Sequence, residues 1–275
     1  VSEARALTLR MVAKVLFHVD IQSSTKEIGN ALNTVFSYAR RRTNAFFSID
    51  DVFPTESRCR YQRAIKALDE LVSNITKKPV NPEENGTSLL HLLRELSANG
   101  ATPSQTFRDH VLTFLLAGHE TVANALTWTW VLLSKHDAAS RLMKQEVAEV
   151  LGNHPPAFQD LPRLRFTKMV LLEAMRLYPP VWLIERCSLN EDTIGDYHIP
   201  AHATLALCQY ITHRHPDIWQ NADRFDTWRF TPEQSDARPR YAYFPFGGGT
   251  LNCIGGELAM MEATIILAIV CQRFH

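Results

Sequence analysis

The chain has 275 residues, of which 45% are apolar and 21% charged, a composition that supports a large buried core and excludes a disordered protein. Its 29 basic and 29 acidic residues cancel, so no surplus of positive charge points to nucleic acid or an anionic membrane as the main partner. The five cysteines include no Cys-x-x-Cys pair, which argues against a disulfide framework and favours a reducing compartment.

The first quarter of the chain, residues 1–71, carries a mostly helical pattern. The basic run Arg40–Arg42 within it indicates a solvated helix face better than it indicates a binding patch. Residues 77–88 contain two prolines and a glycine among mixed charges, so we expect an exposed loop there.

A long apolar helix is predicted from about Pro103 to His136, with Ser104 as its N-cap. Its length would suffice for a bilayer. However, polar residues occupy its middle, from Gly118 to Asn124, where an ionisable group costs roughly 2.5–3.5 kcal/mol in a membrane. A helix buried in the centre of a large soluble protein is therefore the better interpretation.

The remaining elements follow in order along the second half. Helices are predicted over 135–151, ending at a glycine, and over 159–178, closed by two prolines. Residues 181–211 show alternation and turn signals that predict short strands. Residues 212–245 look irregular, and a last apolar helix begins at about Gly255. The predicted fold class is mainly α with a small β region.

The segment from Phe246 to Gly255 reads F-G-G-G-T-L-N-C-I-G. Three successive glycines let the backbone take positive φ angles and approach a bulky group closely. Cys253 then precedes a helix, where free N–H groups and the positive end of the helix dipole stabilise a thiolate. Such a thiolate suits a soft metal such as haem iron. The alternative is a glycine turn followed by a buried free cysteine.

Glu173 and Arg176 are the only charged residues between Lys168 and Glu185. At positions i and i+3 they share one face of an apolar helix, so we expect a buried ion pair with further partners. A surface pair is the alternative interpretation.

The middle of the long helix reads Ala117-Gly118-His119-Glu120-Thr121. Ala117, Glu120 and Thr121 lie on one face, and an acid beside a hydroxyl in an apolar helix can relay protons. The alternative is a packing notch with a threonine that bonds back to the preceding turn. A zinc-protease motif is excluded, because it requires histidine where the chain has Ala123.

A fourth segment runs from His213 to Phe230 and mixes arginines with aromatic residues. Its His213-x-His215 pair could bind a metal only with a third ligand nearby.

Taken together and in this order, the four segments resemble the cytochrome P-450 family of haem-thiolate proteins. The glycine loop is similar to the signature F-G-x-G-x-R-x-C-x-G, and Ala259 matches its usual extension. Glu173 and Arg176 match the family's E-x-x-R pair, and the turn from Ala117 to Thr121 resembles its oxygen-activation motif. The resemblance implies a cytochrome P-450 fold and a single partial domain over residues 1–275.

The resemblance also implies a haem b cofactor whose iron is ligated by the thiolate of Cys253. Glu120 and Thr121 would be the catalytic residues, which hold water and pass protons to oxygen. The residues expected to bind the cofactor are Ala117, Arg186, Phe246, Gly247, Gly249, Cys253, Ile254, Gly255 and Ala259.

The same resemblance implies a structural cluster beneath the cofactor. Arg224 falls where we expect the arginine that joins Glu173 and Arg176 in a three-residue salt bridge.

One departure from the signature concerns haem affinity. The family has a basic residue, which pairs with a haem propionate, where this chain has Leu251. Losing that bond would weaken haem binding by about 1.5–3 kcal/mol, and Arg186 offers partial compensation because its counterpart also reaches a propionate. Val122 replaces a second hydroxyl residue, a smaller change.

The resemblance implies a monooxygenase that inserts one atom of O2 into a small apolar organic substrate. Its electrons would come from a ferredoxin or a flavoprotein reductase, and no nucleic acid is expected as a partner. A non-catalytic, degenerate haem-binding protein is the alternative, and Leu251 favours it. We expect a cytoplasmic, soluble protein of the bacterial type, part of a longer chain that could carry an anchor upstream.

Overall fold

The computed structural model describes residues 1–43, 53, 55–77, 89–98 and 104–274. They form two compact units, Val1–Ala123 and Asn124–His275, and the boundary falls inside one long helix. The expected single domain over residues 1–275 stays a prediction.

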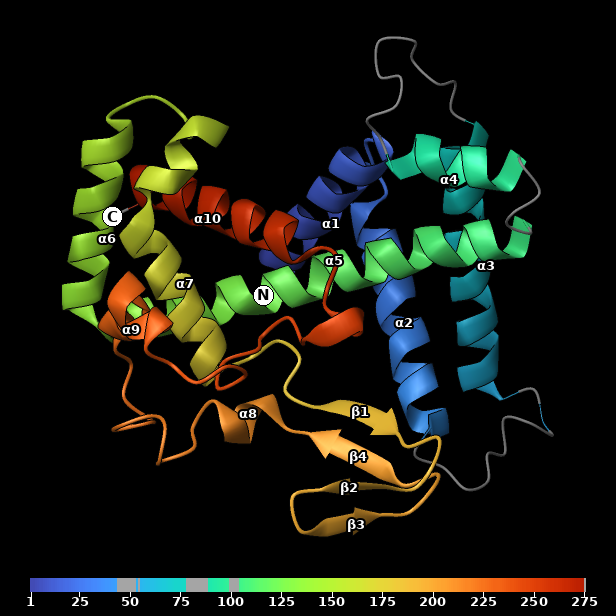
Figure 1. Ribbon diagram of the computed structural model, residues 1–275. Helices are drawn as coiled ribbons and strands as arrows, with labels where there is room; N and C mark the ends of the chain where they lie inside the picture. The colour runs from blue at the N-terminus through green and yellow to red at the C-terminus, as the bar shows by residue number, and fades with distance from the viewer. Residues whose placement is uncertain (44–52, 54, 78–88, 99–103, 275) are drawn as a thin grey trace. The chain divides into compact units, whose positions relative to one another are not determined.

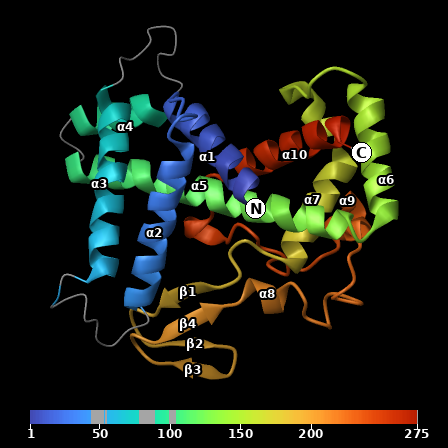
Figure 2. The same cartoon turned by 180° about the vertical axis from the view of Figure 1, so that it is seen from behind.

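The first unit consists of helices that share one hydrophobic core. In chain order they are α1 (Ser2–Phe17), α2 (Thr25–Thr43), α3 (Glu56–Lys77), α4 (Leu89–Ala98) and the first part of α5 (Ser104–Leu133). Helices α2 and α3 lie side by side (Figures 1 and 2), and α1 packs against both α2 and α4. The core forms because apolar residues recur every three or four positions, as Leu9, Val12, Ala13 and Phe17 do in α1.

The expectations for this half of the chain are confirmed where the structure describes them. The segment is helical, and Arg40, Arg41 and Arg42 are exposed on α2. Of the loop predicted over residues 77–88, Lys77 is the last residue of α3, and residues 78–88 lie outside the described residues. None of the helices in the described part of the chain is long and apolar enough to cross a membrane. The cytoplasmic location stays a prediction.

The second unit has a core built from the end of α5 and from α6 (Asp137–Leu151), α7 (Arg165–Leu177) and α10 (Gly256–Arg273). Helices α6, α7 and α10 pack against one another (Figure 1). The buried face of α6 consists of Met143, Val147 and Leu151, four residues apart, and Gly152 ends the helix as predicted.

The expectation of one helix over 159–178 is wrong. The segment forms a 3-10 helix, η3 (Phe158–Arg163), followed by α7. Pro162 has no N–H group, so it cannot continue an α-helical ladder. The Glu146 carboxylate of α6 then accepts the backbone N–H groups of Phe166 and Thr167 at 2.6 and 2.8 Å, and these bonds cap the start of α7.

The β region comprises two antiparallel pairs. Strand β1 (Ile184–Cys187) pairs with β4 (Thr204–Leu207), and β2 (Asp192–Ile194) pairs with β3 (Tyr197–Ile199) through a two-residue turn. Short helices α8 (Gln209–Thr212), η4 (Thr227–Phe230), α9 (Pro232–Asp236) and η5 (Gly249–Leu251) interrupt the irregular chain that follows. The prediction of a mainly α protein with a small β region is confirmed.

Candidate active site

The loop that carries Cys253 is held by two backbone hydrogen bonds. The N–H of Gly247 donates to the carbonyl of Phe244 at 3.0 Å, and the N–H of Cys253 donates to the carbonyl of Phe246 at 2.9 Å. Gly247 and Gly249 have φ angles of +79° and +69°, which residues with side chains rarely adopt. The glycines therefore let the chain turn back and place Cys253 just before α10.

Cys253 is exposed at the surface of its unit, in a stretch of sequence that also exposes apolar side chains. Cys253 is exposed, and its neighbours Leu251 and Ile254 are 67% and 85% exposed. Large apolar side chains around an exposed thiol are typical of a place where an apolar group binds. The donor and its surroundings fit a haem, because a thiolate is a soft ligand that suits haem iron.

The other predicted cofactor residues of this unit lie in two places. Phe246 and Gly255 are half-buried in the loop, and Ala259 follows in the first turn of α10, where its N–H donates to the carbonyl of Gly255 at 2.9 Å. Arg186 lies on β1 with its side chain exposed, and its guanidinium donates to the carbonyl of Glu185 at 2.8 Å. The roles of these residues toward a cofactor stay predictions.

In the first unit, the acid of the expected proton relay is bound by an arginine from the start of the chain. Arg5 Nη2 lies 2.8 Å from Glu120 Oε1, and the two side chains are 35% and 29% exposed. The carboxylate is therefore part of an ion pair that water still reaches.

The contact between α1 and α5 follows one face of α1. Arg5, Thr8 and Val12 are spaced i, i+3 and i+7, so they lie on that face together. The Thr8 hydroxyl donates to the carbonyl of His119 at 2.8 Å. A Cβ atom on Gly118 would lie only 2.8 Å from a methyl group of Val12, so the close approach of α1 requires glycine there. The sequence carries no signal for these contacts, which join residues more than a hundred positions apart.

Thr121 and His119 bond to the preceding turn of α5. The Thr121 hydroxyl donates to the carbonyl of Ala117 at 2.7 Å, the geometry of the alternative interpretation given above. His119 is buried with Nδ1 2.8 Å from the carbonyl of Leu115, and burial lowers the pKa of its imidazole. The ring of His119 is therefore packed inside the unit, while Ala117, Glu120 and Thr121 lie on one face of α5.

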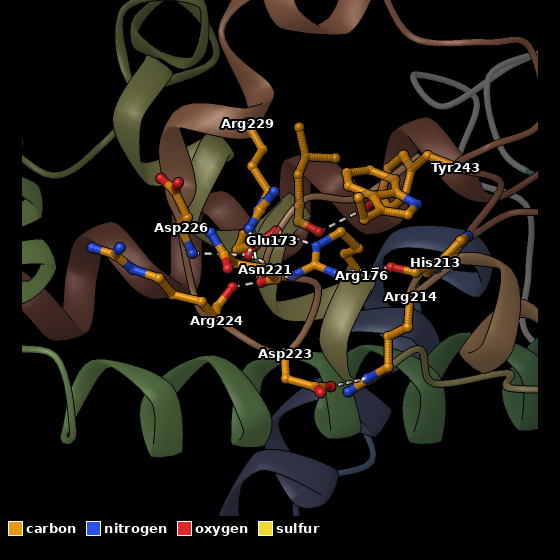
Figure 3. Close-up of polar contacts among 12 residues, drawn as sticks. Glu173, Arg176, His213, Arg214, Asn221, Asp223, Arg224, Asp226, Arg229 and Tyr243 are labelled. Carbon is orange, nitrogen blue, oxygen red and sulfur yellow. Dashed lines mark hydrogen bonds and ion pairs between the residues drawn. The ribbon is translucent and has the colours of Figure 1, made fainter. Parts of the chain in front are cut away.

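The predicted burial of the Glu173–Arg176 pair is confirmed. Both side chains are fully buried, and Arg176 Nε and Nη2 donate to the two carboxylate oxygens of Glu173 at 2.6 and 2.8 Å (Figure 3). Arg176 also donates to the carbonyls of His213 and Arg224, and Glu173 accepts the N–H of Asp226 at 2.9 Å. Burial raises the pKa of the Glu173 carboxyl, and the guanidinium of Arg176 opposes that shift.

The expectation that Arg224 completes this cluster is wrong. The Arg224 side chain is exposed, and the residue contributes only its backbone carbonyl, 3.2 Å from Arg176 Nη2. Arg229 occupies the predicted place instead, with Nε 3.6 Å from Glu173 Oε1 (Figure 3). Each arginine precedes a buried phenylalanine, at positions 225 and 230, so the local sequence alone does not distinguish the two.

Sequence reasoning also missed the aromatic residues around the cluster. The Arg176 guanidinium lies 5.0 Å from the centre of the Trp219 ring, and that of Arg238 lies 4.5 Å from it. The Tyr243 hydroxyl donates to the carbonyl of Leu172 in α7 at 2.8 Å. The high density of aromatic residues and arginines in this segment was the available signal.

No group of three or more His, Cys, Asp or Glu side chains in the described residues could hold a metal ion. The His213-x-His215 pair accordingly lacks a third ligand there. Cys187, Cys208, Cys253 and Cys271 are free thiols.

Comparison with known proteins decides the family, because the model of the family described as Cytochrome P450 matches residues 3–275. The chain belongs to the cytochrome P450 family. Cyclooctatin synthase of Streptomyces melanosporofaciens is 34% identical over 99% of this chain, and pentalenene oxygenase of Streptomyces avermitilis is 30% identical over 99%. The chain covers 61% of each of these relatives.

The fold of the cytochrome P450 chain agrees with this assignment. The crystal structure of the cytochrome P450DA heme domain superimposes with a TM-score of 0.86 at 28% identity, over 98% of this chain and 60% of that one. The family and this likeness to a haem domain support a haem cofactor, and the predicted cytochrome P-450 fold is confirmed.

Proposed function

We propose that the complete protein is a haem-thiolate monooxygenase that inserts one atom of O2 into an apolar organic substrate. The observation that carries the proposal is the exposed thiol of Cys253, which follows a glycine loop and has the exposed residues Leu251 and Ile254 as near neighbours in the sequence. Electrons come from a ferredoxin or a flavoprotein reductase, because a haem that activates O2 needs a supply of single electrons.

The names of relatives support an apolar, hydrocarbon-rich substrate. Cyclooctat-9-en-7-ol 5-monooxygenase of Streptomyces melanosporofaciens is 32% identical to this chain, pentalenene oxygenase 30%, and the carotene epsilon-monooxygenase of Arabidopsis thaliana 30%. These names give a cyclooctatenol, pentalenene and a carotene as the compounds that the relatives oxidise, each a hydrocarbon or a hydrocarbon with an alcohol group. We infer a substrate of that chemical class for this protein.

Cys253 holds the iron as a thiolate in this proposal, and the bonded glycine loop keeps the sulfur at the start of α10. The haem supplies one-electron and oxygen chemistry when it is bound. Glu120 and Thr121 would hold water and pass protons toward oxygen. The Glu120 carboxylate would part from Arg5 when it takes up a proton and pair with it again after releasing that proton. Glu173, Arg176 and Arg229 hold the core and take no part in the chemistry.

Reduction of the purified full-length protein under carbon monoxide tests the proposal. We expect the absorption band of thiolate-ligated haem, and we expect Cys253→Ala to abolish it. Cys187→Ala is the matched control, because Cys187 is another exposed free cysteine, on β1. A thiolate band that survives in the Cys253 variant would show that the sulfur ligand has been misassigned.

A degenerate haem-binding protein is the second candidate, and Leu251 favours it. The exposed leucine cannot make a charge-assisted bond to a haem propionate. Leu251→Arg should tighten haem retention by about 1.5–3 kcal/mol, measured as transfer of haem to an acceptor protein. Haem binding without oxygen uptake, with reductant and apolar substrates supplied, would establish this second function.

A further inference from the structure

Two buried side chains of the second unit form hydrogen bonds with the backbone carbonyl and N–H of Phe244, just before the glycine loop. Gln209 Nε2 donates to the Phe244 carbonyl at 2.7 Å, and the Phe244 N–H donates to His213 Nε2 at 3.0 Å. Gln209 and His213 are both 0% exposed. We name this pair of side chains, Gln209 and His213, the Phe244 clamp.

The clamp is built on the short helix α8. Gln209 begins this helix and His213 caps its end, so a spacing of four residues places both side chains on one face. The helix is itself anchored to the buried ion pair, because Arg176 Nη1 donates to the carbonyl of His213 at 2.8 Å (Figure 3). Trp219 Nε1 adds a bond to the carbonyl of Thr212 at 3.2 Å.

The protonation state of His213 suits this role. Because Nε2 accepts a hydrogen bond, the neutral ring carries its proton on Nδ1. Burial, followed by the positive charges of Arg176 and Arg214, lowers the pKa of His213 to about 3. Nε2 therefore remains a hydrogen-bond acceptor at neutral pH.

The second polar atom of each of these two side chains makes no hydrogen bond within the described part of the chain. Among the residues that the structure describes, His213 Nδ1 and Gln209 Oε1 have no hydrogen-bond partner, although both atoms are buried. Burying two such groups is costly, since an unmade buried hydrogen bond costs about 1–3 kcal/mol. The hydrogen bonds to Phe244 are therefore the side-chain bonds that the structure gives to these two residues.

The clamp continues into the cysteine loop through two further bonds. The Phe244 carbonyl, which Gln209 holds, also accepts the N–H of Gly247 at 3.0 Å. The carbonyl of Phe246, two residues beyond Phe244, accepts the N–H of Cys253 at 2.9 Å. A continuous series of hydrogen bonds thus runs from the Glu173–Arg176 pair to the backbone of Cys253.

We propose that Gln209 and His213 are positioning residues for the thiolate of Cys253, which act by fixing the backbone of Phe244 at the entrance of the glycine loop. The proposal rests on the proposed function of Cys253 as the axial ligand. The clamp itself is a property of the chain and can be measured with or without the cofactor.

Hydrogen–deuterium exchange in the full-length protein tests the clamp directly. His213→Phe keeps a ring of similar size without an acceptor, and Gln209→Met keeps the length without a donor. Each should raise amide exchange in the peptide that spans 244–253 about tenfold, the scale set by loss of one buried hydrogen bond. Ile211→Ala, at an exposed position of the same helix, is the control and should leave exchange unchanged.

A variant that restores the hydrogen-bond acceptor distinguishes a positioning role of His213 from a role in packing alone. His213→Gln places an oxygen acceptor near the position of Nε2, so it should restore slow exchange where His213→Phe does not. In the haem-loaded protein, the Phe variant should lose part of the thiolate band under carbon monoxide, and the Gln variant should keep it. A peptide from α6 serves as the reference for global unfolding.

Unchanged exchange over 244–253 in a folded His213→Phe protein, or a Gln variant no better than the Phe variant, would overturn the proposal. If His213→Phe fails to fold, amide exchange over 244–253 in the Gln209→Met variant tests the proposal instead. If the full-length protein binds no haem, the proposed function fails, while the exchange measurement still decides whether the clamp holds the loop.

Discussion

Arg229 and Arg224 offer a matched test of which arginine completes the buried cluster. The Arg229 side chain is 14% exposed, with Nε 3.6 Å from Glu173 Oε1, and its Nη2 donates to the carbonyl of Asn221 at 3.0 Å. Arg224 projects its side chain into solvent and uses only its backbone. Arg229→Ala should therefore destabilise the protein, and Arg224→Ala should not.

The size of the effect follows from the geometry. Two unit charges 3.6 Å apart attract by about 5 kcal/mol at an effective dielectric constant near 20. Desolvation offsets part of this energy, and Arg176 and the amide of Asp226 still bind the carboxylate after the change. We expect Arg229→Ala to lower the free energy of unfolding by about 2 kcal/mol, or the Tm by about 4–8 °C.

Urea and thermal unfolding of the full-length protein, followed by circular dichroism, would measure both variants. Arg224→Ala should stay within about 0.5 kcal/mol of the wild type, as exposed substitutions usually do. Arg229→Lys should have a free energy of unfolding between those of the wild type and Arg229→Ala, because lysine keeps the positive charge but lacks the planar guanidinium group. The reasoning fails if Arg224→Ala costs as much as Arg229→Ala.

Three further predictions concern the helices. Arg5→Ala should cost no more than about 1 kcal/mol, because both ends of its ion pair with Glu120 are partly exposed, and a double-mutant cycle with Glu120→Gln in urea would measure that coupling. Gly118→Ala should destabilise by about 1–3 kcal/mol in thermal unfolding despite alanine's helix propensity, since its Cβ would meet Val12, and Val12→Ala should recover most of the loss. Burial raises the pKa of Glu262 to about 7, so Glu262→Gln should flatten the dependence of stability on pH between about pH 5 and pH 8.

The direction in which stability changes with pH follows from the proton that Glu262 binds in the folded and unfolded states. The folded protein holds this proton up to about pH 7, whereas the unfolded chain releases it near pH 4.5, so stability is full below 4.5 and falls as the pH rises through 7. The whole span is on the order of 3 kcal/mol. His213 gives the opposite slope below pH 6.5, and comparison of wild type with Glu262→Gln removes its contribution.

Different results would contradict each of the three. A coupling well above 1 kcal/mol would show that the Arg5 pair is more protected than its exposure indicates. A stable Gly118→Ala protein would mean that α1 can move away from α5. Parallel pH profiles for wild type and Glu262→Gln would show that the carboxyl is ionised in the folded state.

Local patterns predicted most of the fold. The apolar stripe of α6 and its glycine stop lie within one stretch of sequence, so periodicity alone places that helix. The single helix over 159–178 failed because its division depends on Pro162 together with a carboxylate of α6, Glu146, which caps α7 from about twenty residues upstream. Such tertiary capping leaves no local signal.

In the candidate site, too, local sequence features could be predicted and contacts between distant residues could not. Cys253 and its glycines are contiguous, so the sequence alone placed the thiol before a helix. The partners that hold the site are distant: Arg5 reaches across 115 positions to Glu120, and His213 across 31 to Phe244. Arg229 was missed because two equivalent Arg-Phe pairs follow each other, and only packing selects the second.

The half-exposed ion pair between Arg5 and Glu120 has a consequence for kinetics. Dissolved ions weaken an attraction that water can reach, so the carboxylate becomes easier to release as salt concentration increases. Encounter with an electron donor also depends on ionic strength. If Glu120 transfers protons as proposed, ionic strength changes the turnover rate in two independent ways: through the Arg5–Glu120 ion pair and through the encounter with the electron donor. Turnover rates measured at different salt concentrations therefore do not report the donor encounter alone.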